Sequence, residues 1–305
     1  MNKRFKVIFS FSILSIFIYY FITYVQENNE IITSFRDISL FMIIIFLAFN
    51  LVSYVIRTLI NIFLFKSMKI NLKFFEAFYL VYMNTLGNLL GPLKAGSGYK
   101  LHYLYKNYDL KISQYVSLNT AYAIMSLFLN FFIVAMLLPL NVNGFQTSYI
   151  LSSLLVLIVG LVFLIVFKLS KRLEDKTKYQ TLNNFVIGFN SLVQDKKNFS
   201  ILLFLGLVQI LYSVILIFLC FYFFNFEIDL LSLIFYVGIG SLSGIFKFTP
   251  GNIGTYEIIM IFTQGFHNVD TLSIITTSVF LRLISYLTLG IIGINKGIKK
   301  LKKTL

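Results

Sequence analysis

Long apolar runs separated by short charged segments dominate this sequence. A helix needs about 20 apolar residues to cross the hydrocarbon core of a bilayer, and the runs that reach this length are 5–25, 38–65, 112–139, 148–169, 199–225 and 271–294. We therefore predict an all-α, polytopic membrane protein with about six full spans. The first run follows a basic N-terminus as in a signal peptide, but it is too long and lacks a small-residue cleavage site. We expect it to be retained.

Two further apolar regions are interrupted near their middle. Residues 74–108 break at Gly91-Pro92, and residues 228–267 break at Pro250-Gly251. Proline lacks the backbone N–H that a helix interior needs, so it ends or kinks a helix. Each region is therefore predicted to form two short helices joined by a non-helical tip. Whether a pair re-enters the membrane or crosses it twice stays open, because both arrangements return the chain to the same side.

Composition supports the membrane assignment and the distribution of charge gives an orientation. The chain is 58% hydrophobic and 12% charged, whereas soluble domains carry about 25% charged residues. Its 26 Lys and Arg exceed its 12 Asp and Glu, for a net charge of +14. Nearly all of the basic residues fall on one side of the predicted membrane, and the opposite loops hold Arg36 alone. Cytoplasmic loops collect Lys and Arg, so we predict cytoplasmic termini in a cell membrane and no nucleic-acid partner.

This layout contains an internal symmetry. Residues 38–139 and 199–294 each consist of a span, a broken pair and a span, in opposite orientations, which is typical of inverted-repeat transporters. We treat residues 1–305 as a single transmembrane domain built from these two units. Between the units, residues 181–197 show apolar positions at helical spacing and predict an interfacial amphipathic helix. The basic residues beside it would contact anionic lipids of the inner leaflet.

Five charged residues lie at membrane depth: Arg57, Lys94, Lys247, Glu257 and Arg282. Each costs about 2.5–3.5 kcal/mol at a helix centre, so such residues usually face a cavity or a partner. Arg57 either faces a cavity or extends to the membrane surface. Glu257 either caps its helix, pairs with Lys247 or Arg282, or binds a cationic head group. Because four of the five are basic, we predict that this region binds an anion, such as a lipid phosphate.

The two tips add backbone donors to this charge. Helices that begin near Gly96 and Gly254 would direct their N–H groups toward the membrane midplane, a common way to hold an anion. The predicted substrate-binding residues are Asn88, Pro92, Lys94, Gly96, Lys100, Lys247, Pro250, Gly251, Asn252, Gly254, Glu257 and Arg282.

Catalytic chemistry has few candidates in this chain. Cys220, His102 and His267 are the only residues of their types, so we predict no metal centre, and we expect no cofactor and no catalytic residues. An intramembrane transferase is the weaker hypothesis, since Glu257 and the two histidines are the only candidates for a general acid or base near membrane depth. We expect both histidines to lie at the membrane interface.

Two motifs at the breaks resemble those of the lysylphosphatidylglycerol synthase transmembrane region, also called the flippase-like domain family. The first is Asn88-Leu-Leu-Gly-Pro92-Leu-Lys-Ala-Gly96-Ser-Gly98-Tyr-Lys100, and the second is Phe248-Thr-Pro250-Gly251-Asn252-Ile-Gly254-Thr-Tyr-Glu257. The resemblance covers nearly the whole chain. Three residues depart from it: Asn252 replaces a usual Gly, Lys100 stands where Arg is common, and Tyr256 stands where a basic residue often precedes the Glu.

The resemblance implies a function in lipid movement. In bifunctional members this domain moves an aminoacylated phospholipid between leaflets, while a soluble domain, which we do not find here, synthesises it. Other members occur beside glycolipid or polyprenyl-phosphate-sugar pathways. We expect a flippase-like translocase of an anionic, aminoacylated or polyprenyl-phosphate-linked lipid, working by alternating access. The alternative is a lipid-modifying transferase or its accessory subunit. A separate lipid-synthesising enzyme or a second copy of the chain would be the protein partner.

Overall fold

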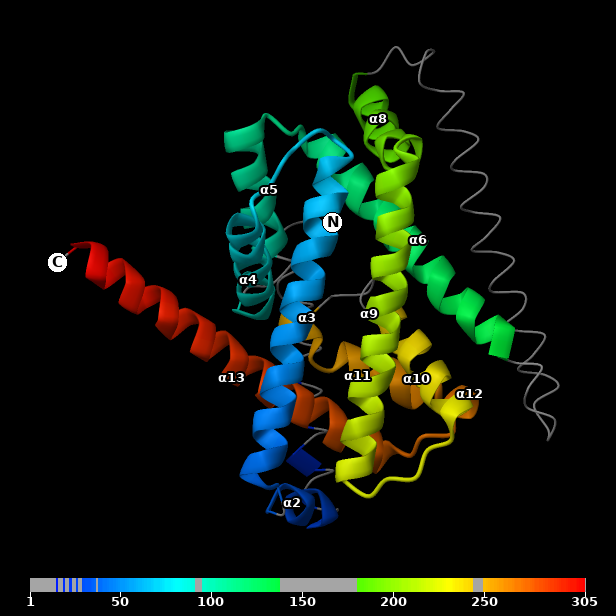
Figure 1. Cartoon of the computed structure of the whole chain (residues 1–305). Coiled ribbons are helices and arrows are strands. Elements are labelled where there is room, and N and C mark those ends of the chain that lie inside the picture. The colour runs from blue at the N-terminus through cyan, green and yellow to red at the C-terminus, as the bar shows by residue number, and fades with distance from the viewer. Residues whose placement is uncertain are drawn as a thin grey trace.

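The computed structural model describes residues 29–36, 38–90, 95–137, 180–243 and 249–304, with a few single positions between 15 and 26. All regular elements in these ranges are helices (Figure 1). They are α2 (Asn29–Arg36), α3 (Leu40–Lys66), α4 (Phe74–Leu90), α5 (Ala95–Tyr108), α6 (Ile112–Leu137), α8 (Gln180–Gln194), α9 (Lys196–Phe223), α10 (Leu230–Ser243), the 3-10 helix η2 (Pro250–Asn252), α11 (Thr255–Phe262), α12 (Gln264–His267) and α13 (Thr271–Thr304). The predicted all-α class is confirmed for these residues.

The predicted spans agree with the long helices. Within the described residues, three helical segments are long and apolar enough to cross a membrane: Leu40–Lys66, Lys196–Phe223 and Thr271–Gly293. They correspond to the predicted runs 38–65, 199–225 and 271–294. The run 112–139 is occupied by α6, whose 26 residues extend for about 39 Å. The predicted spans 5–25 and 148–169 lie outside the described residues, so the total number of spans stays a prediction.

Both interrupted regions form separate helices. Helix α4 ends at Leu90 and α5 begins at Ala95, and the tip between them, with Pro92 and Lys94, lies outside the described residues. Helix α10 ends at Ser243 and is followed, after residues 244–248, by η2 and α11. The 17 residues of α4 and the 14 of α10 give lengths of only about 25 Å and 21 Å. Each is shorter than the 30 Å core of a typical bilayer.

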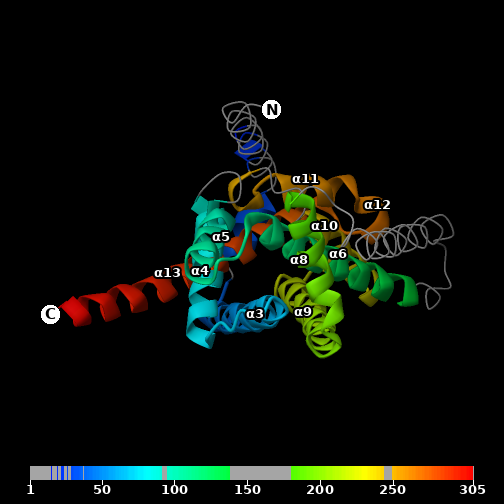
Figure 2. The ribbon, with the colours of Figure 1, turned by 90° about the horizontal axis from the view of Figure 1, so that it is seen from above.

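Helices α3 and α9 pack against each other. They lie side by side in both views and run in opposite directions (Figures 1 and 2). Ser39 begins α3 by accepting a hydrogen bond from the Met42 backbone N–H at 3.1 Å. Toward the same end of the helix, Phe46 packs edge-to-face on Phe280 of α13 with ring centroids 4.9 Å apart. Such aromatic pairs add stability beyond the area that they bury, so they join α3 to α13.

Helix α8 differs in part from the predicted interfacial helix 181–197. It ends at Gln194, because Asp195 caps the next helix by accepting the Asn198 backbone N–H at 3.1 Å. Lys196 therefore belongs to α9. Helix α8 also packs closely on α6: a Cβ at Gly188 would lie 2.7 Å from the Gln114 carbonyl oxygen. The apolar face that the sequence predicted thus contacts another helix over part of its length.

The α4–α5 pair depends on a close contact between two glycines. A Cβ at Gly87 would lie 2.6 Å from the Gly96 Cα, and a Cβ at Gly96 would overlap the Asn84 backbone carbonyl. Real side chains do not approach backbone atoms so closely, so the two helices can pack at this distance only with glycine at both positions. This contact brings Asn84 and Asn88 of α4 opposite Ser97 of α5.

Replacing Gly96 with Ala is expected to force α4 and α5 apart. Overpacking of this kind costs about 1–3 kcal/mol, which we expect to appear as a lower melting temperature in detergent. The control is Gly98→Ala on the same helix, where a Cβ would meet no atom within 4 Å and alanine favours helix by up to about 1 kcal/mol. Equal melting temperatures for the two variants would contradict this account of the α4–α5 contact.

Candidate functional site

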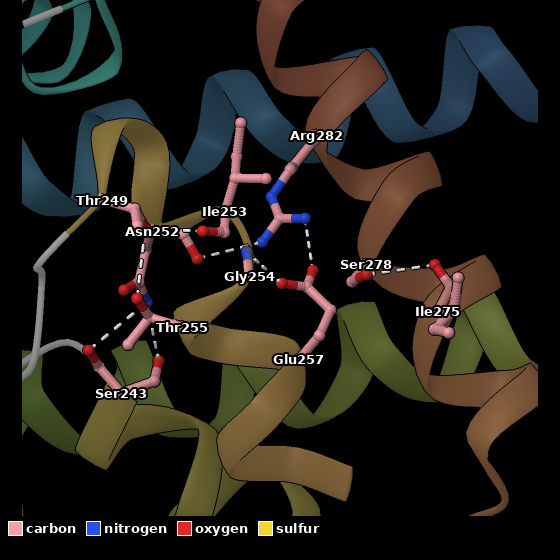
Figure 3. Close-up of polar contacts among 10 residues, drawn as sticks. All are labelled: Ser243, Thr249, Asn252, Ile253, Gly254, Thr255, Glu257, Ile275, Ser278 and Arg282. Carbon is pink, nitrogen blue, oxygen red and sulfur yellow. Dashed lines mark hydrogen bonds and ion pairs between the residues drawn. The ribbon is translucent and has the colours of Figure 1, made fainter. Parts of the chain in front are cut away.

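The second tip is a tight turn with three left-handed residues. Gly251, Asn252 and Gly254 have φ angles of 62°, 61° and 80°. Glycine adopts this region without strain, and Asn is among the few other residues that tolerate it. The Asn252 side chain also donates to Ser243 Oγ at 3.1 Å, which joins the tip to the end of α10 (Figure 3). Asn252, a departure from the family motif, is therefore compatible with the turn.

Threonines on either side close the turn. Thr249 Oγ1 donates to the Ile253 carbonyl at 2.6 Å and lies 3.1 Å from Thr255 Oγ1 (Figure 3). Both threonine side chains are buried. Backbone groups of the turn that water cannot reach are thus paired within the protein, as buried polar groups require.

Glu257 is held entirely by protein groups. Its carboxylate is fully buried, accepts a hydrogen bond from the Gly254 N–H at 2.9 Å and forms an ion pair with the Arg282 guanidinium (Figure 3). Arg282 Nη2 also donates to the Asn252 carbonyl at 3.3 Å. Both roles that the sequence suggested for Glu257 within the protein, a helix cap and an ion pair, are present. The ion pair fixes the second tip against α13.

A polar cavity of about 230 Å³ lies between the two broken pairs. It is bounded by α3, α4, the second tip and α13. Its lining residues are Arg57, Asn84, Thr85, Asn88, Leu89, Thr249, Gly251, Asn252, Arg282, Ser285, Tyr286 and Leu289. We call it the tip cavity. None of these described lining residues is acidic, and two carry a guanidinium group, so the tip cavity favours an anion.

Arg57 supplies the uncompensated charge of the tip cavity. Among the described residues no carboxylate forms an ion pair with it, whereas Arg282 is paired with Glu257. The Arg57 side chain is exposed and lines the cavity. Sequence reasoning left its role open between a cavity and the membrane surface and did not include it among the binding residues. Its membrane depth was the available signal, and the structure places it in the tip cavity.

The first broken pair contributes a group of amides. Ser97 Oγ of α5 donates to Asn84 Oδ1 at 3.0 Å, and the Ser97 N–H donates to Asn88 Oδ1 at 3.3 Å. Asn84 and Asn88 lie one turn apart on α4 and both line the tip cavity. Asn88 was predicted and Asn84 was missed. The signal that could have found it is the pair of amides four residues apart on an apolar helix.

The remaining predicted binding residues are distributed differently. Asn88, Gly251, Asn252 and Arg282 line the tip cavity, whereas Pro250, Gly254 and Glu257 shape the second tip and Gly96 shapes the α4–α5 contact. Pro92, Lys94 and Lys247 lie outside the described residues. All twelve assignments as substrate ligands stay predictions.

Lys100 lies away from the tip cavity. Its ammonium group contacts Asn61 Oδ1 and sits 4.8 Å from the Phe65 ring centroid and 5.8 Å from that of Tyr115. Its side chain is buried between α3 and α6. Aromatic faces stabilise a desolvated cation, so Lys100 joins α5 to its neighbours. In this arrangement it does not face a ligand in the tip cavity.

An apolar groove of about 670 Å³ adjoins the tip cavity. It runs between α4 and α13 and is lined by Tyr82, Leu86, Leu89, Tyr286, Leu289, Gly290 and Gly293. Leu89, Tyr286 and Leu289 line both spaces. A basic, amide-rich chamber that opens beside an apolar groove matches the two parts of a lipid, a polar head group and its acyl chains.

The two histidines do not contribute to this site. His267 is fully buried: its Nδ1 accepts the Val269 N–H at 3.2 Å, so Nε2 donates to the Met260 carbonyl at 3.0 Å. Both ring nitrogens are occupied by backbone groups, which leaves neither free for acid–base chemistry. His267 is thus enclosed by protein, whereas His102 is exposed on α5, and the interfacial position of both stays a prediction.

Comparisons with known proteins agree with the resemblance of the motifs. A family model described as the lysylphosphatidylglycerol synthase TM region matches residues 7–293. No curated protein and no solved structure matches the chain. The family match, together with the apolar helices, indicates a membrane protein with a lipid-related function.

Proposed function

Because the chain belongs to the lysylphosphatidylglycerol synthase TM region family, we propose that it moves a lipid with an anionic head group between membrane leaflets. The lipid phosphate would occupy the tip cavity, and the acyl chains would lie along the groove between α4 and α13. The observation that carries the proposal is the uncompensated Arg57 in a cavity that α4 and the second tip border and that adjoins an apolar groove.

The charges favour an anionic lipid over an aminoacylated one. An aminoacyl head group brings ammonium groups that need carboxylates or other acceptors when they leave water. Glu257 is the acidic residue nearest to the tip cavity among the described residues, and its oxygens already bind Gly254 and Arg282. A phosphate, by contrast, matches the planar donor array of a guanidinium. Phosphatidylglycerol or another phosphate-bearing lipid is therefore the substrate class that we favour.

The two tips supply the elements that would move during transport. Each separates two short helices, and the second includes positive-φ residues whose backbone can change conformation at low cost. Rocking of one broken pair against the other would open the cavity to either leaflet, as in other transporters with broken helices. The Glu257–Arg282 pair would keep the second tip and α13 together as one body.

Leaflet exchange in liposomes tests this function. Purified protein is reconstituted with head-group-labelled phosphatidylglycerol, and the label on the outer leaflet is quenched with a membrane-impermeant reagent. We expect faster exchange than in protein-free liposomes and in liposomes that contain an unrelated helical membrane protein. Exchange no faster than in these two controls, for every phosphate-bearing lipid tested, would contradict the proposal.

A further inference from the structure

A second polar cavity, of about 300 Å³, lies between α6, α9, α10 and α11. Its lining residues are Ser126, Asn130, Gln209, Ile210, Ser213, Ile217, Tyr236, Val237, Gly240, Ser241 and Tyr256. We call it the neutral cavity, because none of these described residues is charged. Tyr256 and Glu257 are neighbours on α11, and Glu257 pairs with Arg282 of the tip cavity, so this helix lies beside both spaces.

The polar residues of the neutral cavity do not join helices to one another through the bonds that they make. In membrane bundles such side chains usually bond across helices. Here Ser213 Oγ donates to the Gln209 carbonyl at 2.9 Å, Ser241 Oγ to the Gly238 carbonyl at 2.6 Å and Asn130 Nδ2 to the Ser126 carbonyl at 2.7 Å. Each of these bonds stays within its own helix, and α6, α9 and α10 pack through the apolar side chains Ile133, Val214 and Ile234 instead.

These internal bonds leave acceptors for a ligand, beside the donors of the tyrosine hydroxyls and of the Gln209 amide. The hydroxyl protons of Ser213 and Ser241 are used on their own helices, so their oxygens offer lone pairs. Gln209 Oε1 is buried and has no hydrogen-bond partner. A buried acceptor without a partner costs about 1–3 kcal/mol, so the neutral cavity is complementary to a group that donates several hydrogen bonds.

Glycine at position 240 keeps part of this space open. A Cβ there would lie 3.3 Å from Tyr256 Cε2, so a larger residue would push the tyrosine ring into the cavity or toward α13. Tyrosine rings and hydroxyls together form surfaces on which sugar and glycerol groups pack, with an apolar face and a polar edge. A site with acceptors, aromatic faces and no charge has the chemistry of a polyol site.

We propose that the neutral cavity binds an uncharged, hydroxyl-rich group, such as the glycerol or sugar portion of a lipid head group or a free sugar. Hydroxyl protons of this group would bond to Gln209 Oε1 and to the serine oxygens of α9 and α10. An ammonium group would also donate, but no carboxylate among the described lining residues offsets its desolvation. The site is independent of Arg57 and of the charge of the tip cavity.

Native mass spectrometry of the full chain in a detergent without a sugar head group tests this site. The probes are a diacylglycerol hexoside, plain diacylglycerol, free glucose and a long-chain alkylamine. We expect the hexoside to be retained at least tenfold better than diacylglycerol, and glucose to compete with it if a free sugar suffices. Preference for the alkylamine, or equal retention of hexoside and diacylglycerol, would overturn the proposal.

Variants assign the binding to the neutral cavity. Gln209→Leu should weaken hexoside retention about fivefold to tenfold, since it removes one acceptor, and Ser213→Ala should have a smaller effect. The matched control is Ser200→Ala, an exposed serine of α9 that bonds to its own helix at the Lys196 carbonyl. Unchanged hexoside retention in a folded Gln209→Leu protein would overturn the assignment of this site to the neutral cavity. A variant that loses only phosphatidylglycerol exchange would instead bear on the function proposed for the tip cavity.

Discussion

Replacing Glu257 with Ala is expected to lower the free energy of unfolding by about 3–5 kcal/mol, the usual cost of removing one partner from a buried ion pair. The carboxylate is fully buried and its two oxygens bind Gly254 and Arg282. Without it, Arg282 keeps its charge at membrane depth and the first turn of α11 loses its cap. The second tip should then separate from α13.

Conservative variants separate the two roles of Glu257. Glu257→Gln keeps an acceptor for the Gly254 N–H but removes the charge, so it should destabilise less than Ala. Combining Glu257→Gln with Arg282→Met removes both charges and should restore part of the loss. Glu227→Ala, an exposed acidic residue, is the control and should change stability by no more than about 0.5 kcal/mol. Denaturation in detergent measures all four, and equal midpoints for Glu257→Ala and Glu227→Ala would refute the role of the pair.

Replacing Arg57 with Gln is expected to slow phosphatidylglycerol exchange at least about tenfold without changing stability. Losing one charge-assisted hydrogen bond to a phosphate costs about 1.5–3 kcal/mol, which corresponds to about tenfold or more in binding. Because no described carboxylate pairs with Arg57, its removal leaves no buried charge behind. Arg57→Lys keeps the charge but not the planar fork, so an intermediate rate is expected.

Lys66→Gln is the matched control for Arg57. It removes a basic residue from the last turn of the same helix, outside the tip cavity. We expect its exchange rate to equal that of the wild type. If Lys66→Gln slowed exchange as much as Arg57→Gln, a general attraction of anionic lipids to basic residues would explain both results.

The sequence could predict the helices because their causes are local. Runs of apolar residues as long as 38–65 and 199–225 have no alternative to a helix in lipid, and α3 and α9 begin and end within three residues of these limits. The breaks follow from proline in the same way. Asp195 caps α9, so the predicted helix 181–197 ends earlier than expected. This cap is also a local signal, but the prediction followed the apolar periodicity, which continues past it.

The site could be predicted only in part, because its contacts join distant segments. Glu257 had three possible partners in the sequence, and only the packing of α11 on α13 selects Arg282. Lys100 is the last residue of the first motif, yet α3 and α6 supply Asn61, Phe65 and Tyr115 to bury it. The neutral cavity is built from serines and amides on separate helices. None of these residues forms a motif in the sequence, so only the packing of the helices brings them together.

The most direct test of an anion-selective translocase is the ratio of exchange rates for two lipids whose head groups differ in the sign of their net charge. Phosphatidylglycerol and lysylphosphatidylglycerol with identical acyl chains and labels are compared in the same proteoliposomes. No described carboxylate pairs with Arg57, and the Glu257 carboxylate already binds Arg282 and the Gly254 N–H. We therefore predict that phosphatidylglycerol exchanges faster and that this preference is lost in Arg57→Gln. Faster exchange of the lysyl lipid, unaffected by Arg57→Gln, would contradict it.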